Sequence, residues 1–135
     1  MLLLDTHTYL WFISDNPLLP QWVSEEIQTS ENVFVSIASF WEIAIKNAKG
    51  LLDIQVPVSK MMEDCALLNF TVLPINGMHL DKLKVLPYIH KDPFDRILIC
   101  QAQAEDMKLV TAQSMTAKPA APGTRSSTPV KPECS

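Results

Sequence analysis

The stretch LLLDTHTYLWFIS, residues 2–14, decides the fold expected for this chain. It opens with LLLD, residues 2–5, a short apolar run of the kind expected for a strand that is buried on both faces, as in parallel sheets. The bulky residues that follow predict a helix that ends before the DNP at residues 15–17. A buried strand followed by a helix is the repeating unit of an α/β protein.

The same alternation continues along the chain. Five further helices are expected at residues 20–28, 38–49, 59–70, 77–86 and 92–106, and three further strands at residues 33–36, 71–75 and 108–111. Strands that alternate with helices pair in parallel, with right-handed crossovers between them. The sequence therefore predicts an α/β fold with a mostly parallel central sheet flanked by helices.

Length and composition fit one folded domain with a tail. A chain of 135 residues, of which 47% are hydrophobic, is large enough to bury one core but too short to divide into two domains. We therefore expect one domain over residues 1–115. Residues 116–135 contain four prolines and no aromatic residue. Because this segment has little apolar area to offset the entropy cost of ordering, it is predicted to be disordered.

Several classes of protein are disfavoured. The net charge of -4 argues against a broad basic surface for nucleic acid. No apolar stretch approaches the roughly 20 residues of a membrane helix. Asp5 interrupts the opening apolar run too early for a signal peptide, so a cytoplasmic protein without membrane association is expected. The cysteines and histidines lack the spacing of a zinc site.

Two acidic residues stand at the edges of apolar segments, and the sequence leaves their roles open. Asp5 ends the first predicted strand, where it either caps the following helix or binds a cation at the carboxyl end of the sheet. Glu42 lies in an apolar helical segment. It fits a capping box with Ser39, an i,i+4 ion pair with Lys46, or a ligand position in a shared acidic pocket.

The motif DPFDR, residues 92–96, supplies two more carboxylates at the start of a helix. Asp92 before Pro93 matches an N-cap followed by the first helical residue, where the missing proline N–H costs nothing. This places Asp95 in the first turn, where the helix dipole favours its ionised form. Asp95 is then free to be a ligand, and Arg96 beside it is a candidate to contact a phosphate or an acid.

Carboxylates that gather in one place repel each other unless a cation lies between them. Asp5, Glu42 and Asp95 are oxygen donors of the kind that suits Mg²⁺ or Mn²⁺. Such an ion lowers the pKa of bound water and stabilises charge on a phosphoryl group, which indicates hydrolysis of a phosphodiester.

Four stretches, LLLDTHTYLWF, SIASFWEIAIK, HKDPFDRILICQA and LVTA, occur in the order and approximate spacing of a PIN domain. In detail the chain resembles a VapC-type toxin ribonuclease of a bacterial toxin–antitoxin pair. The resemblance covers residues 1 to about 113, and the combination of DTH, WEI and DPFDR makes it specific.

The resemblance implies a three-layer PIN-like fold with five parallel strands, and a type II toxin that cleaves RNA with Mg²⁺ or Mn²⁺. It assigns Asp5, Glu42 and Asp95 as catalytic, metal-binding acids, with Thr6 as a hydroxyl that supports the first acid. It also implies an RNA substrate, a homodimer and a cognate antitoxin that covers the site.

The chain departs from the family after the last predicted strand. Where the family has LVTAD or LVTAN, this chain has LVTAQ, so Gln113 stands at the fourth acidic position and offers an oxygen without charge. The proline-rich tail replaces the final edge strand, so that strand is expected to be missing and its neighbour uncovered. A frameshift or truncation is one explanation.

Three hypotheses follow from these residues. The first is a metal-dependent endoribonuclease toxin, in which Lys46, Lys49, Lys91 and Arg96 are candidates to contact RNA phosphates. The second is a catalytically impaired PIN-like protein that acts as an antitoxin-binding or dimerisation module. The third, a phosphomonoesterase with Asp5 as nucleophile, is disfavoured because His7 replaces the second aspartate that such an enzyme needs.

Aromatic residues near the N-terminus have two possible roles. They are Trp11, Phe12 and Trp22. Aromatic side chains are enriched at protein interfaces, but packing in the core is the favoured role here.

Overall fold

A computed structural model describes residues 1–89 and 91–115, except for the side chain of Gln113. The tail predicted to be disordered, residues 116–135, lies outside the described residues. So does any strand that follows Met115.

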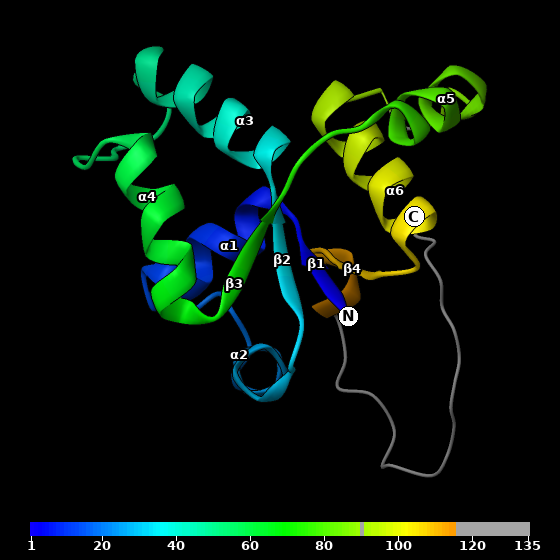
Figure 1. The fold of residues 1–135 in the computed structure, drawn as a ribbon. Coiled ribbons are helices and arrows are strands. Elements are labelled where there is room, and N and C mark those ends of the chain that lie inside the picture. The colour runs from blue at the N-terminus through cyan, green and yellow to red at the C-terminus, as the bar shows by residue number, and fades with distance from the viewer. Residues whose placement is uncertain (90, 116–135) are drawn as a thin grey trace, which may run out of the picture.

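The described residues form a sheet of four parallel strands. The strands are β1 (Leu2–Leu4), β2 (Val33–Ser36), β3 (Phe70–Leu73) and β4 (Lys108–Val110), in the order β3-β2-β1-β4. In the register of the central pair, Leu2 lies opposite Val33. Because every pairing is parallel, all four strands end at the same edge of the sheet, which is the upper edge in Figure 1.

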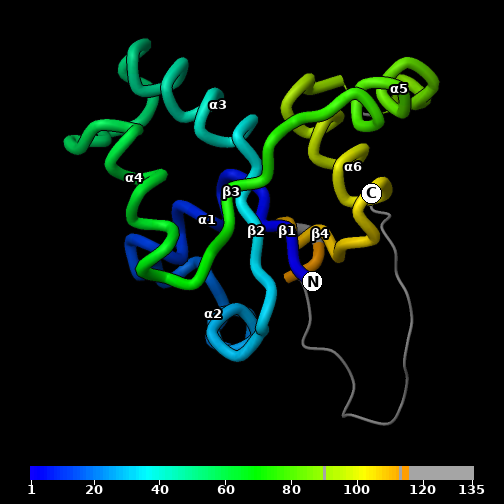
Figure 2. Tube along the Cα trace, viewed as in Figure 1, coloured from blue at the N-terminus to red at the C-terminus, as the bar shows by residue number. Residues whose placement is uncertain are grey.

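The alternation of side chains along the strands builds two cores and three layers. Leu2 and Leu4 face one core, while Leu3 faces the other, as the two-residue period of a strand requires. The first core is covered by α1 (Thr6–Ile13), α2 (Gln21–Thr29), α3 (Ile37–Ala48) and α4 (Val58–Asp64). The second is covered by α6 (Pro93–Glu105), against which α5 (Gly77–Val85) packs (Figure 2). The expected three-layer α/β fold is confirmed.

One expected helix is wrong in its second half. The segment at residues 59–70 was expected to be a single helix, but α4 ends at Asp64 and a short 3₁₀ helix, η1 (Cys65–Leu68), follows it. Asn69 then adopts a left-handed conformation with φ of 63°, which ends the helical path. Phe70 therefore begins β3, where its side chain is buried in the first core.

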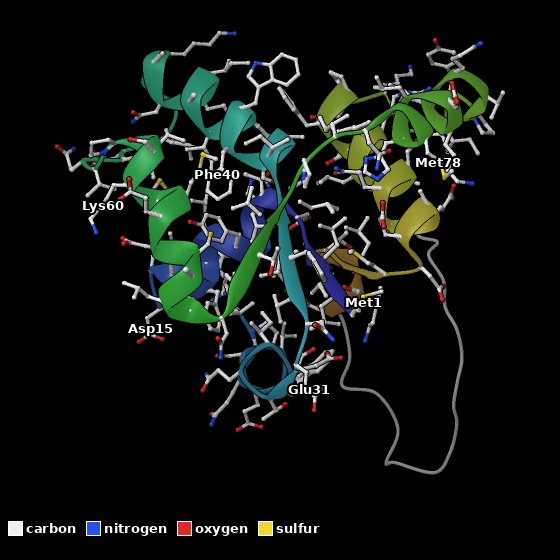
Figure 3. The ribbon with its side chains drawn as sticks, in the orientation of Figure 1. Met1, Asp15, Glu31, Phe40, Lys60 and Met78 are labelled. Atoms are coloured by element: carbon white, nitrogen blue, oxygen red, sulfur yellow. The ribbon has the colours of Figure 1, made fainter. Side chains whose placement is uncertain are left out.

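The first core contains most of the aromatic residues. Phe40, labelled in Figure 3, extends from α3 into this core and meets the ring of Tyr9 edge-on, with 5.4 Å between the ring centroids. Trp11, Phe12 and Trp22 are partly buried and pack against the same core. These contacts support core packing as their role. Among the described residues, no helix has the length and apolar character that crossing a membrane requires.

Candidate active site

Asp5 lies where β1 ends and α1 begins. Its backbone N–H donates to the carbonyl of Val110 at 3.1 Å, which ties the end of β1 to the end of β4. Its Oδ1 accepts a hydrogen bond from the N–H of Thr8 at 2.8 Å, so Asp5 is the N-cap of α1. Of the two roles that the sequence leaves open for Asp5, the capping role is present, and it holds the carboxylate at the carboxyl edge of the sheet.

Glu42 projects from the second turn of α3, the helix that follows β2. Its side chain is only 7% exposed. Lys46 Nζ donates to Glu42 Oε2 at 2.7 Å, so the i,i+4 ion pair expected from the sequence is confirmed. The capping box with Ser39 is wrong. The N-cap of α3 is Ser36, whose hydroxyl oxygen accepts from the N–H of Ala38 at 3.0 Å, because the helix begins directly at the end of the strand.

Two buried hydroxyls join the first and third helices at Glu42. Thr6 Oγ1 donates to Glu42 Oε1 at 2.7 Å and lies 3.0 Å from the hydroxyl oxygen of Ser39. Ser39 is fully buried. The family resemblance assigns Thr6 to support Asp5, whereas the hydroxyl of Thr6 donates to Glu42. The contact of Ser39 with Thr6 was not predicted, and the available signal is the position of Ser39 one helical turn before Glu42.

The start of α6 has the arrangement expected from DPFD. Asp92 is the N-cap, and its Oδ1 accepts from the N–H of Phe94 at 2.8 Å and of Asp95 at 3.3 Å. Pro93 occupies the first helical position, so Asp95 is in the first turn. The surroundings of Asp95 act against the ionised form that the helix dipole favours. Burial raises the pKa of this carboxyl above its ordinary value, and the charge of Asp92 adds to the effect.

The three predicted acids lie in one electrostatic neighbourhood. Besides burial and Asp92, the charges of Asp5 and Glu42 also raise the pKa of Asp95. Burial is the main cause that raises the pKa of Asp5, against the hydrogen bonds from Thr8 that lower it, and Glu42 adds to the rise. Acids from positions 5, 42 and 95 of the chain thus interact at the upper edge of the sheet.

Two basic groups face the acids. The hydrogen bond to Glu42 raises the pKa of Lys46, and the charges of Glu42, Asp92 and Asp95 raise it further. The second basic group is His7, whose charge lowers the pKa of both Asp5 and Asp95. It thereby opposes the effect of the neighbouring carboxylates, which raise these pKa values. No part in the site was predicted for His7. Its position two residues after Asp5, at the exposed start of a helix, was the available signal.

The donors match a hard divalent cation in chemistry but not yet in placement. Carboxylate oxygens are the ligands that Mg²⁺ and Mn²⁺ prefer. Within residues 1–89 and 91–115, however, no three His, Cys, Asp or Glu side chains form a group that could hold a metal ion as they stand. Both oxygens of Glu42 are engaged, one by Thr6 and the other by Lys46. The donor set therefore fits such an ion in chemistry, and the acids have to move closer together to hold one.

Arg96 follows Asp95 in the sequence, but its side chain contacts the segment that precedes α6. Its side chain is buried, and its guanidinium donates to the carbonyls of Leu86 and Pro87 at 3.1 and 3.0 Å. The same group lies 4.2 Å from the centre of the Tyr88 ring. These contacts anchor the α5–α6 connection. Gln113 begins a short 3₁₀ helix, η2 (Gln113–Met115), just after β4.

The chain is a three-layer α/β protein, and its interacting carboxylates lie beyond the ends of the parallel strands. This edge of the sheet is where α/β proteins place their ligand sites. The chain matches the PIN domain family over residues 2–120 and belongs to that family. PIN domains are generally nucleases, which agrees with an acidic site of this kind. No curated protein matches the chain.

Proposed function

We propose that this protein is a metal-dependent endoribonuclease toxin of a type II toxin–antitoxin system. One observation carries the proposal: at the strand ends of a PIN domain, the charges of Asp5 and Glu42 raise the pKa of Asp95, and the charge of Glu42 also raises the pKa of Asp5, although the three residues are far apart in the sequence. Carboxylates that repel each other are a cost to the fold, and a divalent cation removes that cost.

Each residue of the site has a defined task in this proposal. Asp5, Glu42 and Asp95 hold Mg²⁺ or Mn²⁺, which supplies an activated water and offsets charge on the phosphoryl group. Thr6 orients Glu42 through its hydrogen bond to Oε1. The cap on Thr8 fixes the rotamer of Asp5. Lys46 neutralises Glu42 until the cation binds.

The test compares wild-type protein with Asp5→Asn in RNA cleavage with Mg²⁺ or Mn²⁺. Asparagine caps a helix as well as aspartate does, so α1 should keep its start while a negative ligand is lost. We expect cleavage to fall by at least about 100-fold, in line with loss of a group that holds the catalytic ion. Mn²⁺ binding, measured by electron paramagnetic resonance, should weaken in parallel.

Asp81→Asn is the matched control. Asp81 is an exposed aspartate on α5, so this substitution removes the same charge outside the site. It should leave cleavage and Mn²⁺ binding at the wild-type level. Equal cleavage by wild-type protein and Asp5→Asn would remove the proposed mechanism.

A second candidate is a catalytically impaired PIN domain that acts as an antitoxin-binding or dimerisation module. Its support is the engagement of both Glu42 oxygens, together with the neutral Gln113 at the position where the family has an acid. Under this account the wild type cleaves weakly and Gln113→Asp increases both Mn²⁺ affinity and cleavage. Vigorous cleavage by the wild type eliminates it.

The toxin assignment extends to partners and location. We propose an RNA substrate, a homodimer, a cytoplasmic location and a cognate antitoxin that covers the acidic site. A small upstream open reading frame whose product co-purifies with this chain and blocks cleavage would support the antitoxin. Sedimentation of the purified chain measures the oligomeric state.

A further inference from the structure

An aromatic pair stands directly beside two of the acids. Trp41 precedes Glu42 on α3, and Phe94 precedes Asp95 on α6. Their rings meet edge-on, with 5.4 Å between the centroids and 87° between the planes. The contact joins the starts of two helices that cover opposite faces of the sheet.

The pair is fixed but open to solvent. Successive helical residues point about 100° apart, so Trp41 turns outward where Glu42 turns inward. The exposed fractions agree, with 61% for Trp41 and 5% for Glu42. Phe94 is half-buried and supports one side of the indole. An exposed tryptophan held by a second ring costs little entropy when a planar ligand stacks on it.

A large exposed indole does little for folding, because most of its apolar area remains in water. Exposed aromatic rings do, however, bind unpaired nucleobases, whose faces stack on them in single-stranded RNA. Bases inside a duplex are already stacked on their neighbours and offer no free face. Lys46, on the same helix as Trp41, is also affected by the charges of Asp92 and Asp95 at the start of α6, so a cationic group lies at this part of the site.

We propose that the Trp41–Phe94 pair is a stacking subsite for one unpaired base next to the scissile phosphate. This inference rests on the proposed function and adds the residue pair that holds one base of the RNA beside the acids. It explains why the aromatic residues adjoin the acids: a base stacked at the rim places the following phosphodiester over the carboxylates. Duplex RNA lacks the free base that the subsite binds.

The experiment measures binding of a fluorescein-labelled, unstructured 12-nucleotide RNA by anisotropy, in the full-length chain carrying Asp5→Asn to suppress cleavage. Trp41→Leu keeps an apolar side chain but removes the aromatic face. We expect it to weaken binding by about five-fold or more, the lower range for loss of one base–aromatic stack. Trp41→Phe should recover most of the affinity. A duplex of the same sequence should bind weakly to every variant.

Leu67→Ala is the control. Leu67 is 83% exposed on η1, which precedes β3 and so lies at the amino end of the strands, opposite the acids. It should leave RNA affinity unchanged. A series of RNAs, each with one abasic site at a different position, locates the stacked base. At one position only, the abasic site should lower the affinity of the protein with Trp41, and Trp41→Leu should then cause no further loss.

The outcomes separate this inference from the proposed function. Cleavage by the wild-type chain tests the function and does not depend on Trp41. Unchanged RNA affinity in Trp41→Leu overturns the subsite even if the wild type cleaves. An equal loss on single-stranded and duplex RNA also overturns it. So does a change in sedimentation without a change in RNA affinity, because Trp41 would then belong to a protein interface.

Discussion

Lys46 Nζ lies 2.7 Å from Glu42 Oε2, and this ammonium group is the cation that the buried glutamate meets in the described structure. Thr6 engages the other oxygen of the same carboxylate. A metal ion that binds Glu42 therefore shares the carboxylate with these partners or displaces one of them. The pair keeps the acidic site compatible with folding before any metal ion binds.

Removing the ammonium should favour the metal ion. In Lys46→Gln, Glu42 Oε2 loses its charged partner and the site becomes more negative. We expect Mn²⁺ to bind about five-fold more tightly, equivalent to about 1 kcal/mol for an ion pair that is partly exposed. Isothermal titration calorimetry measures the change, with Lys49→Gln at the exposed end of α3 as the control. Weaker binding in Lys46→Gln would show that Lys46 positions Glu42 for the ion.

The hydroxyl of Thr6 should contribute to stability through Glu42. Thr6→Val keeps the shape of the side chain but leaves Glu42 Oε1 without its donor at a buried position. We expect the free energy of unfolding to fall by about 1–3 kcal/mol in urea denaturation. Thr6→Ser should restore most of it. Thr71→Val on β3, where the side chain is exposed, should change little. A Thr6→Val protein as stable as the wild type contradicts this role.

The capping role of Asp92 at the start of α6 can be separated from the effect of its charge on Asp95. Asp92→Ala removes the acceptor for the N–H groups of Phe94 and Asp95, and should lower the free energy of unfolding by about 1 kcal/mol. Asp92→Asn keeps the acceptor and should retain the stability. Because Asp92 raises the pKa of Asp95, both variants should lower that pKa, which carboxyl NMR titration measures. An unchanged pKa of Asp95 would contradict the coupling.

The acidic site should make stability fall with rising pH. The folded-state pKa of Asp95 lies above its ordinary value of 3.8, so the folded chain binds this proton more tightly than the unfolded chain. The free energy of unfolding therefore decreases as pH rises from 3.8 through the folded-state pKa, and the penalty is complete above it. Relative to wild type, Asp95→Asn should become more stable over this range. A difference between the two that stays constant with pH contradicts the raised pKa.

Divalent cations should reverse that penalty. A ligand that binds only the folded state stabilises it by mass action, by about 1.4 kcal/mol at ten times its dissociation constant. Mg²⁺ or Mn²⁺ should thus raise the melting temperature of the wild type at pH 7 and leave that of Asp5→Asn nearly unchanged. Calorimetry with and without EDTA measures both. The same shift in both proteins would place the binding elsewhere.

The sequence by itself determined the local structure that depends on neighbouring residues. The apolar run at Leu2–Leu4, the cap and proline at Asp92 and Pro93, and the ion pair of Lys46 with Glu42 all depend on contacts within a few residues. The local sequence led to a wrong prediction where two serines both suited the start of a helix. Ser36 and Ser39 both suit a helix start, and only the end of β2 selected Ser36 as the cap.

Only the tertiary structure decided which acids interact and which polar groups support them. Parallel pairing of β1 with β2 brings Asp5 near Glu42, and packing of α6 on the opposite face brings Asp95 to the same edge. Desolvation raises the pKa of Asp95, the charges of Asp92, Asp5 and Glu42 raise it further, and the charge of His7 lowers it. That balance depends on groups far apart in the chain, so it does not appear in any local pattern.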